Sequence, residues 1–233
     1  MNPQNLLERI DQVRDRMAAA AAQAGRSVDS ITLLAVSKGQ PAEIIRAAAA
    51  AGLTEFGESY PQEALPKLDA LADLGDRGVR WHFVGRLQSN KTRLVAERFA
   101  WVHALDRLKV AQRLSEQRPY YAPPLNVCLQ VNIGGEATKG GVAPGELAAL
   151  AGEVARLPRL RLRGLMCIPP EEPDPQRQRA AFATLRRLLE TLNTHSLELD
   201  TLSMGMSADL EAAILEGSSC LRVGTALFGA RPA

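Results

Sequence analysis

Short apolar segments alternate with amphipathic helical patterns along almost the whole chain. The apolar or β-rich segments are 31–37, 53–57, 81–84, 101–104, 125–133, 162–168, 199–204 and 220–223. Between them, apolar residues recur at steps of three and four, as in the stripe Phe182, Leu185, Leu188, Leu189 and Leu192. This strand–helix alternation is typical of a parallel sheet, because parallel strands need a long crossover connection.

The first segment predicts one further helix. Leu6, Ile10, Val13 and Met17 recur at helical spacing, and Gly25 ends the pattern. Eight strand–helix units in 233 residues fit a compact (β/α)8 TIM barrel, an α/β fold. We predict a single domain over residues 1–233 with an extra N-terminal helix. An open doubly wound sheet is the alternative, but no GxGxxG motif follows the first strand.

Composition narrows the function classes. Apolar residues make up 46% and charged residues 23%, as in an average globular protein. The net charge of +2 and the lack of an aromatic–basic motif argue against a nucleic-acid or arginine-faced adaptor protein. No apolar run approaches the roughly 18 residues of a membrane span, and no signal-peptide core is present. We therefore expect a protein bound neither to nucleic acid nor to membrane.

The three cysteines, Cys128, Cys167 and Cys220, have no metal-ligand spacing and are odd in number. They fit neither a zinc site nor a disulfide framework. We therefore expect no metal and a reducing, cytoplasmic environment.

Lys38 directly follows the first apolar segment, at the strand end where TIM barrels carry their sites. Partial desolvation lowers the pKa of an ammonium group, and the resulting amine can form a Schiff base with an aldehyde. The alternative is an ion pair with a nearby carboxylate such as Glu58, at the end of the second strand. Position alone leaves both interpretations open and favours the ion pair.

Glycine and hydroxyl residues follow the seventh and eighth strands, where these barrels commonly bind phosphate. They are Ser203, Gly205, Ser207, Gly224 and Thr225. Glycine lets backbone N–H groups face an anion, and the hydroxyls add donors. As alternatives, Ser207 could cap a helix, and 224–225 could form a tight turn. A Schiff-base lysine with a phosphate cradle indicates pyridoxal 5'-phosphate (PLP) or a sugar-phosphate aldolase.

Arg222 helps to separate these two ligands. It lies within the apolar eighth strand and therefore needs a partner. One candidate partner is a carboxylate inside the barrel, and the other is the pyridine nitrogen of PLP. Because guanidinium donates hydrogen bonds but cannot accept them, such a ring nitrogen stays unprotonated and the ring is a weak electron sink.

Seven segments, in order from residue 34 to 231, resemble the pyridoxal phosphate homeostasis proteins, a family similar to the N-terminal barrel of alanine racemase. They are LAVSK (34–38), FGESYPQE (56–63), WHFVGRLQSNK (81–91), VNIGGEATKG (131–140), GLMCIP (164–169), LSMGMSADLE (202–211) and RVGTALFGAR (222–231). The resemblance implies a barrel that holds PLP as an internal aldimine on Lys38. It also implies storage, carriage or buffering of the cofactor within the cell, with apo PLP-dependent enzymes as candidate recipients.

The resemblance also implies roles for individual residues. Arg222 faces the ring nitrogen, and Ser59 lies near the ring hydroxyl, where the family often has asparagine. The phosphate is held by Ser203, Gly224 and Thr225, with Gly205 and Ser207 in the same loop region. The sequence departs from the family at Gln40, where a second lysine is common, whereas Lys139 matches a lysine sometimes considered a secondary contact. His82, on a predicted strand, is interpreted as a hydrogen-bonded core histidine.

A PLP enzyme such as a weak amino-acid racemase is the alternative function. Racemisation needs an acid/base on each face of the substrate carbon. In alanine racemase a tyrosine of a second domain supplies one of them, and we do not expect that domain here. Of the three tyrosines, Tyr60 follows the second strand, near the predicted mouth. We therefore expect a non-enzymatic, monomeric PLP-binding protein without catalytic residues.

Overall fold

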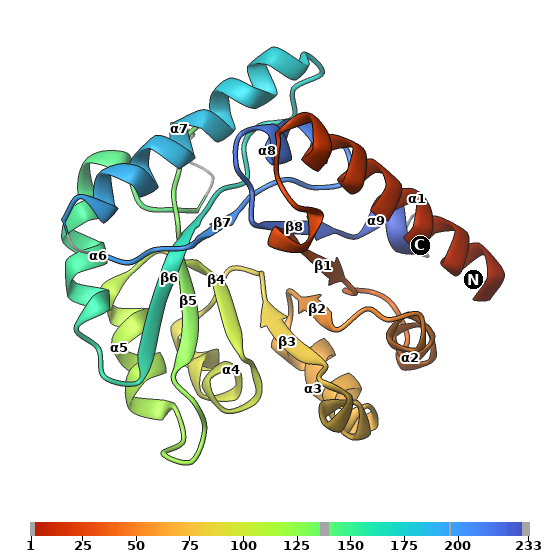
Figure 1. Ribbon diagram of the computed structural model, residues 1–233. Helices are drawn as coiled ribbons and strands as arrows, with labels where there is room; N and C mark the ends of the chain where they lie inside the picture. Colours follow the sequence, from red (N-terminus) through yellow and green to blue (C-terminus); the bar gives the residue numbers. More distant parts are fainter. Residues whose placement is uncertain (1–2, 136–139, 196, 230–233) are drawn as a thin grey trace.

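The computed structural model describes residues 3–135, 140–195 and 197–229, and its centre is a closed barrel of parallel strands (Figure 1). The strands pair in chain order, and β8 pairs with β1 to close the barrel. Their bounds are β1 (Thr32–Val36), β2 (Glu55–Glu58), β3 (Arg80–Phe83), β4 (Trp101–Leu105), β5 (Leu125–Gln130), β6 (Leu160–Met166), β7 (Thr201–Ser203) and β8 (Cys220–Val223). The predicted TIM barrel is confirmed.

Helices surround the strands and bury their apolar faces against the barrel (Figure 1). Their bounds are α1 (Pro3–Gln23), α2 (Ala42–Ala50), α3 (Pro61–Ala70), α4 (Thr92–Arg98), α5 (Leu108–Gln117), α6 (Leu147–Ala155), α7 (Pro175–Asn193), α8 (Leu210–Leu215) and α9 (Thr225–Phe228). Four 3-10 turns, η1 (Val28–Ser30), η2 (Ala72–Arg77), η3 (Ser89–Lys91) and η4 (Pro144–Glu146), complete the described elements.

The extra helix α1 packs outside the barrel against α8 and α9 (Figure 1). Those two helices have only six and four residues, so α1 supplies the cover that they are too short to give. Its buried stripe is the one predicted, from Leu6 to Met17. Arg16 on the same helix pairs with Glu211 of α8 at 2.6 Å and donates to the carbonyl of Ser207 at 3.0 Å. The helix therefore also holds the loop after β7.

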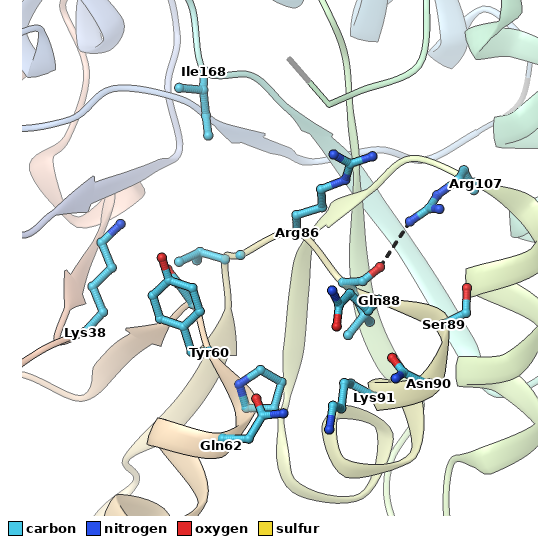
Figure 2. A pocket seen from close by; sticks show the side chains of 15 residues that line it. Lys38, Tyr60, Gln62, Arg86, Gln88, Ser89, Asn90, Lys91, Arg107 and Ile168 are labelled. Atoms are coloured by element: carbon cyan, nitrogen blue, oxygen red, sulfur yellow. Dashed lines mark hydrogen bonds between the residues drawn. The ribbon is translucent and has the colours of Figure 1, made fainter. Parts of the chain in front are cut away.

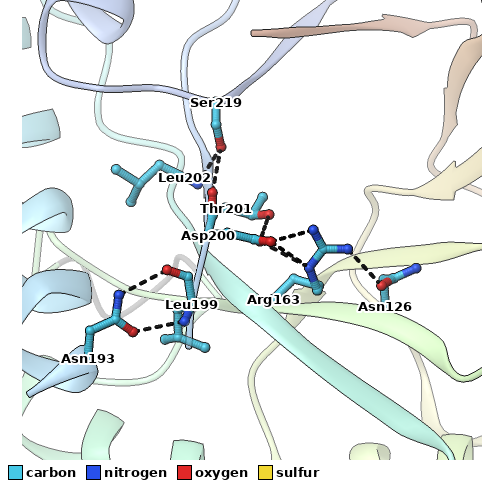
Figure 3. Close-up of polar contacts among 8 residues, drawn as sticks. All are labelled: Asn126, Arg163, Asn193, Leu199, Asp200, Thr201, Leu202 and Ser219. Atoms are coloured by element: carbon cyan, nitrogen blue, oxygen red, sulfur yellow. Dashed lines mark hydrogen bonds and ion pairs between the residues drawn. The ribbon is translucent and has the colours of Figure 1, made fainter. Parts of the chain in front are cut away.

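A polar cluster lies at the N-terminal ends of the strands, which we call the lower mouth (Figure 3). Arg163 of β6 pairs with Asp200, directly before β7, and donates to Asn126 of β5 at 3.2 Å. Its guanidinium also lies 5.0 Å from the ring centre of Trp101. These contacts join neighbouring strands at the end of the barrel opposite Lys38.

The barrel interior contains a polar group among its apolar side chains. His82 is buried, as predicted, and its Nε2 lies 2.6 Å from Glu55 Oε2. Its Nδ1 lies 2.9 Å from Nε2 of His103, a second buried histidine that the sequence reasoning did not single out. The core histidine at position 82 is thus confirmed, but it belongs to a larger hydrogen-bonded set.

Candidate functional site

Lys38 lies in the turn after β1, at the C-terminal mouth of the barrel. A cleft of about 850 Å³ opens beside it, bounded by the segments 59–62 and 84–91, Arg107 and Ile168 (Figure 2). Lys38 and Ser59 thus line a common cleft, and Tyr60 points into the same space. The lining residues include lysines and arginines but no carboxylate among the described part of the chain.

A buried network lies beneath the turn that carries Lys38. Lys67 of α3 donates to Glu58 Oε1 at 3.0 Å, to Glu63 Oε1 at 2.6 Å and to the carbonyl of Ser37 at 3.1 Å. The hydroxyl of Ser37 donates to Glu58 Oε1 at 2.7 Å. The carboxylate suggested as an ion-pair partner for Lys38 is therefore paired with Lys67, and the network joins the turn to β2 and α3.

Glu58 is fully buried, and its burial affects the pKa of its carboxyl group. Burial raises the pKa of its carboxyl group, although the hydrogen bond from Ser37 and the charge of Lys67 act in the opposite direction. Its second oxygen, Oε2, has no hydrogen-bond partner among the described residues. Glu58 therefore carries a desolvation cost that its contacts only partly offset.

Arg222 of β8 is buried inside the barrel without an ion-pair partner among the described residues. Its Nη1 donates to the carbonyl and hydroxyl oxygens of Ser203, at 2.5 and 2.8 Å, and its Nη2 donates to the carbonyl of Cys167 at 2.8 Å. The salt bridge considered from the sequence is thus not formed in the described structure. These bonds use three of five guanidinium N–H groups, which leaves donors for an acceptor such as a pyridine nitrogen.

Arg222 lies on β8, and Lys38 lies in the turn after β1, the strand next to β8. β1 pairs with β8 so that Leu34 lies opposite Arg222 and Ala35 opposite Val223. Lys38 follows three residues after Ala35, so it lies above Arg222 at the mouth. The two residues therefore place a primary amine and a buried hydrogen-bond donor on the same side of the barrel.

Ser203 has a different environment from the one that the resemblance implies. It is fully buried, and its hydroxyl lies between Arg222 and Nδ1 of His103, which is 2.7 Å away. The hydroxyl thus contacts interior side chains rather than the loops after β7 and β8. Its immediate role in the structure is to hold the guanidinium.

The loops after β7 and β8 meet at the mouth. Ser207 accepts a hydrogen bond from the backbone N–H of Ala226 at 3.1 Å, so its hydroxyl joins the two loops. The alternative that Ser207 caps the next helix is wrong, because α8 begins at Leu210 with Asp209 before it. Thr225 is exposed at the start of α9. The remaining predicted phosphate residues are two glycines in the same loops.

Close packing requires a glycine at position 205 and makes the position of Gly224 tight. Gly205 has φ +94°, and a Cβ there would lie 2.5 Å from Ala213 Cβ and 2.7 Å from Leu221 Cδ2. A Cβ at Gly224 would lie 3.2 Å from the carbonyl oxygen of Val36. Both loops therefore lie tight against their neighbours and leave little room for a side chain at either glycine.

Ser59 is held by a glycine that the sequence reasoning missed. Gly85, directly after the Val84 that follows β3, packs so closely on the backbone of Ser59 that a Cβ there would overlap its carbonyl oxygen. The N–H of Val84 also donates to the carbonyl of Glu58 at 2.9 Å. The only available signal was the glycine after a predicted strand.

The cysteines are buried, free thiols. Burial raises the pKa of Cys167 and of Cys220 to about 12 and raises that of Cys128 as well. Neutral thiols of this kind are poor nucleophiles.

The described residues contain no group of histidine, cysteine and carboxylate side chains arranged to hold a metal ion. None of the helices within the described ranges combines the length and apolarity of a membrane span.

Comparison with known proteins places these features in a family. A family model described as alanine racemase, N-terminal domain, matches residues 9–232. The pyridoxal phosphate homeostasis protein of Pseudomonas aeruginosa is 60% identical over 226 residues, covering 97% of this chain and 96% of that protein. The Escherichia coli K12 protein of the same name is 51% identical over 227 residues, covering 97% of each. PipY from Synechococcus elongatus, solved with PLP bound, superposes with a TM-score of 0.84 at 37% identity, covering 96% of this chain and 100% of that one.

Proposed function

This chain belongs to the pyridoxal phosphate homeostasis protein family, and we propose that it binds PLP at the C-terminal mouth of its barrel and holds it in reserve. In this function the protein stores, carries or buffers the cofactor. Its relatives are named as homeostasis proteins rather than as enzymes. PipY, which shares the fold, has been solved with PLP bound.

The observation that carries the proposal is the placement of Lys38 in the turn after β1, with Arg222 buried on the neighbouring strand β8. PLP carries an aldehyde that condenses with a primary amine, with loss of one water, and Lys38 is the amine at the mouth. Arg222, on the adjacent strand, retains N–H donors and has no carboxylate partner among the described residues. An amine and a donor arranged in this way match the two ends of a pyridine aldehyde.

The remaining groups fit the rest of the cofactor. Ser207, Gly224 and Thr225, with Gly205 shaping the loop, would hold the phosphate from the loops after β7 and β8. Ser59 lines the cleft beside Lys38 and would donate to the ring hydroxyl from there. Ser203 supports Arg222 from below.

The position of Arg222 favours storage of PLP over catalysis with it. Guanidinium only donates, so Arg222 keeps the ring nitrogen unprotonated and the ring a weak electron sink. A weak sink gives little help in removing a substrate proton. Arg222 would therefore favour holding PLP over activating it for catalysis.

An amino-acid racemase is the second candidate, and the position of Tyr60 favours it. Tyr60 is exposed and lines the same cleft as Lys38 (Figure 2). Its hydroxyl is the one tyrosine hydroxyl on the described lining of this cleft, and a second acid/base is what racemisation requires. Turnover of alanine enantiomers that is lost in both Lys38→Ala and Tyr60→Phe would support this function.

The proposal is tested by titrating PLP into the purified protein and recording the visible absorbance. We expect one equivalent to bind, and Lys38→Ala to lose the band that borohydride removes. Lys91→Ala, which changes a lysine of the same cleft, is the matched control and should bind as the unaltered protein does. Equal loss in both variants, or no binding by the unaltered protein, would contradict the proposal.

We further propose a monomer that works in the cytoplasm. A reducing compartment suits its three free thiols. Apo PLP-dependent enzymes are the recipients that this function requires, because the cofactor acts only after transfer to them.

A further inference from the structure

A continuous set of hydrogen bonds crosses the barrel interior from Arg222 to the lower mouth. We call these five residues the interior chain. Arg222 Nη1 lies 2.8 Å from Ser203 Oγ, which lies 2.7 Å from His103 Nδ1. His103 Nε2 lies 2.9 Å from His82 Nδ1, and His82 Nε2 lies 2.6 Å from Glu55 Oε2. Each of the five residues is at most 6% exposed.

The chemistry of the two ends fixes the direction of every bond. The Glu55 carboxylate only accepts, so His82 carries its proton on Nε2. Burial lowers the pKa of His82 and of His103, so each ring is neutral and carries one proton. His82 Nδ1 is then an acceptor, and His103 must donate from Nε2.

The other end agrees with this assignment. His103 Nδ1, which has no proton, accepts from the hydroxyl of Ser203. That hydroxyl in turn accepts from Arg222, which can only donate. Every donor therefore points from Arg222 toward Glu55, and no member competes with another for a proton.

The chain ends at solvent. A cavity of about 280 Å³ at the lower mouth is lined by Glu55, His82 and His103, together with Arg80 and Arg163. Arg80 also pairs with Glu55, and Trp101 stacks on His82 with a ring separation of 5.5 Å. Arg80 thus holds Glu55 at the lower mouth, and the proposed cofactor site lies at the other end of the barrel.

We propose that Ser203, His103, His82 and Glu55 are positioning residues for the cofactor: the interior chain orients Arg222 and keeps its remaining N–H donors directed at the ring nitrogen. Arg222 forms no ion pair in the described structure, and the hydrogen bonds of the interior chain join it to Glu55 instead. The proposal rests on the proposed function because it assigns Arg222 to the PLP ring.

The first test needs no cofactor. Long-range ¹H–¹⁵N NMR of the unloaded protein reports which ring nitrogens carry protons, and exposed His195 serves as the solvent-facing reference. We expect His82 and His103 to be neutral and protonated on Nε2 at about pH 7. A proton on Nδ1 of either ring would overturn the chain.

The second test measures the cofactor. We expect Ser203→Ala and His103→Phe to weaken PLP binding about tenfold and to shift the visible absorbance maximum of the bound cofactor. Cys128→Ala, a deletion in the same buried interior, should change neither. Variants that lose only stability while keeping the affinity and spectrum would show that the chain is merely structural and would overturn the proposal.

The two tests separate the proposals. If the unaltered protein binds no PLP, the proposed function fails and the positioning role fails with it, whereas the NMR result still decides the bond directions. If PLP binds normally and the variants match the unaltered protein, only the positioning role fails.

Discussion

Gly205 illustrates how single residues shape the candidate phosphate loops. Its positive φ and the nearness of Ala213 and Leu221 leave no room for a side chain. The loop after β7 therefore lies flat on α8 and β8, and this brings Ser207 within reach of Ala226. The missing side chain of Gly205 therefore shapes this loop as much as the polar groups of the loop do.

We predict that Gly205→Ala destabilises the protein by about 1–3 kcal/mol, because it adds both backbone strain and a steric overlap. Urea denaturation measures the loss. Gly152→Ala is the control, because Gly152 lies in α6 with no atom within 4 Å of an added Cβ. That change should stabilise by about 0.5–1 kcal/mol. Similar effects at the two positions would contradict this account of Gly205.

Two helices, α1 and α3, support the mouth of the barrel from outside the strands. The first, α1, covers the barrel where α8 and α9 are too short. The second, α3, reaches beneath the turn of Lys38 through Lys67. Both place their anchoring side chains on one face and leave the opposite face to solvent.

Within α1 we predict a strong difference between two neighbouring aliphatic positions. Ile10 is fully buried and Leu7 is 49% exposed. Ile10→Ala should cost about 2–5 kcal/mol because it opens a cavity, whereas Leu7→Ala should stay within about 0.5 kcal/mol of the unaltered protein. Thermal or urea unfolding of both variants decides the point. A small loss for Ile10→Ala would mean that α1 is not integral to the fold.

For the network under Lys38, we predict that Lys67→Met costs about 3–5 kcal/mol at neutral pH, because it leaves the Glu58 carboxylate buried without the cation that pairs with it. Removing the lysine raises the pKa of Glu58 further above its ordinary value. The folded variant then binds its proton more tightly than the unfolded chain does. Its stability is therefore greater in acid and is lost as the pH rises through the folded pKa.

Urea midpoints at about pH 5 and pH 7 test this sign. The deficit should shrink at the lower pH, and adding Glu58→Gln to the variant should recover part of the loss at neutral pH. A deficit that is equal at both pH values, with no recovery in the double variant, would count against a buried charge at Glu58.

At the scale of the whole molecule, the barrel was predictable because alternation is a long-range pattern. The ends of the strands were less predictable than the barrel. The predicted segment 199–204 contains a strand of three residues, since buried Leu199 and Met204 extend the apolar run into the loops. Positions in or after the predicted strands singled out Lys38, Arg222 and the glycine loops as candidates. The family resemblance assigned their roles and added Ser59, and their cofactor contacts remain predictions.

The interior contacts were not predictable in the same way. A strand pattern shows that His82 is buried but not what it meets across the barrel. His103 lies 21 residues and one strand further on, and Ser203 lies 100 residues beyond that. Such partners depend on barrel closure and register, which no local window of sequence contains.

The whole molecule should also be a monomer in solution. The large exposed apolar side chains of the described residues are scattered over several elements rather than gathered in one patch; they are Leu7, Val28, Tyr60, Tyr120, Tyr121 and Ile168. Light scattering coupled to size exclusion should give the mass of one chain, with or without PLP. A mass of two chains would contradict this and would direct attention to the cleft that contains Tyr60.

The central claim is that Lys38 anchors PLP, and the most direct measurement is borohydride reduction of the loaded protein followed by peptide mass mapping. The account predicts one modified peptide, carrying the reduced cofactor on Lys38, and no such peptide from Lys38→Ala. Modification of another lysine in its place, or a loaded protein that borohydride leaves unmodified, would contradict the account.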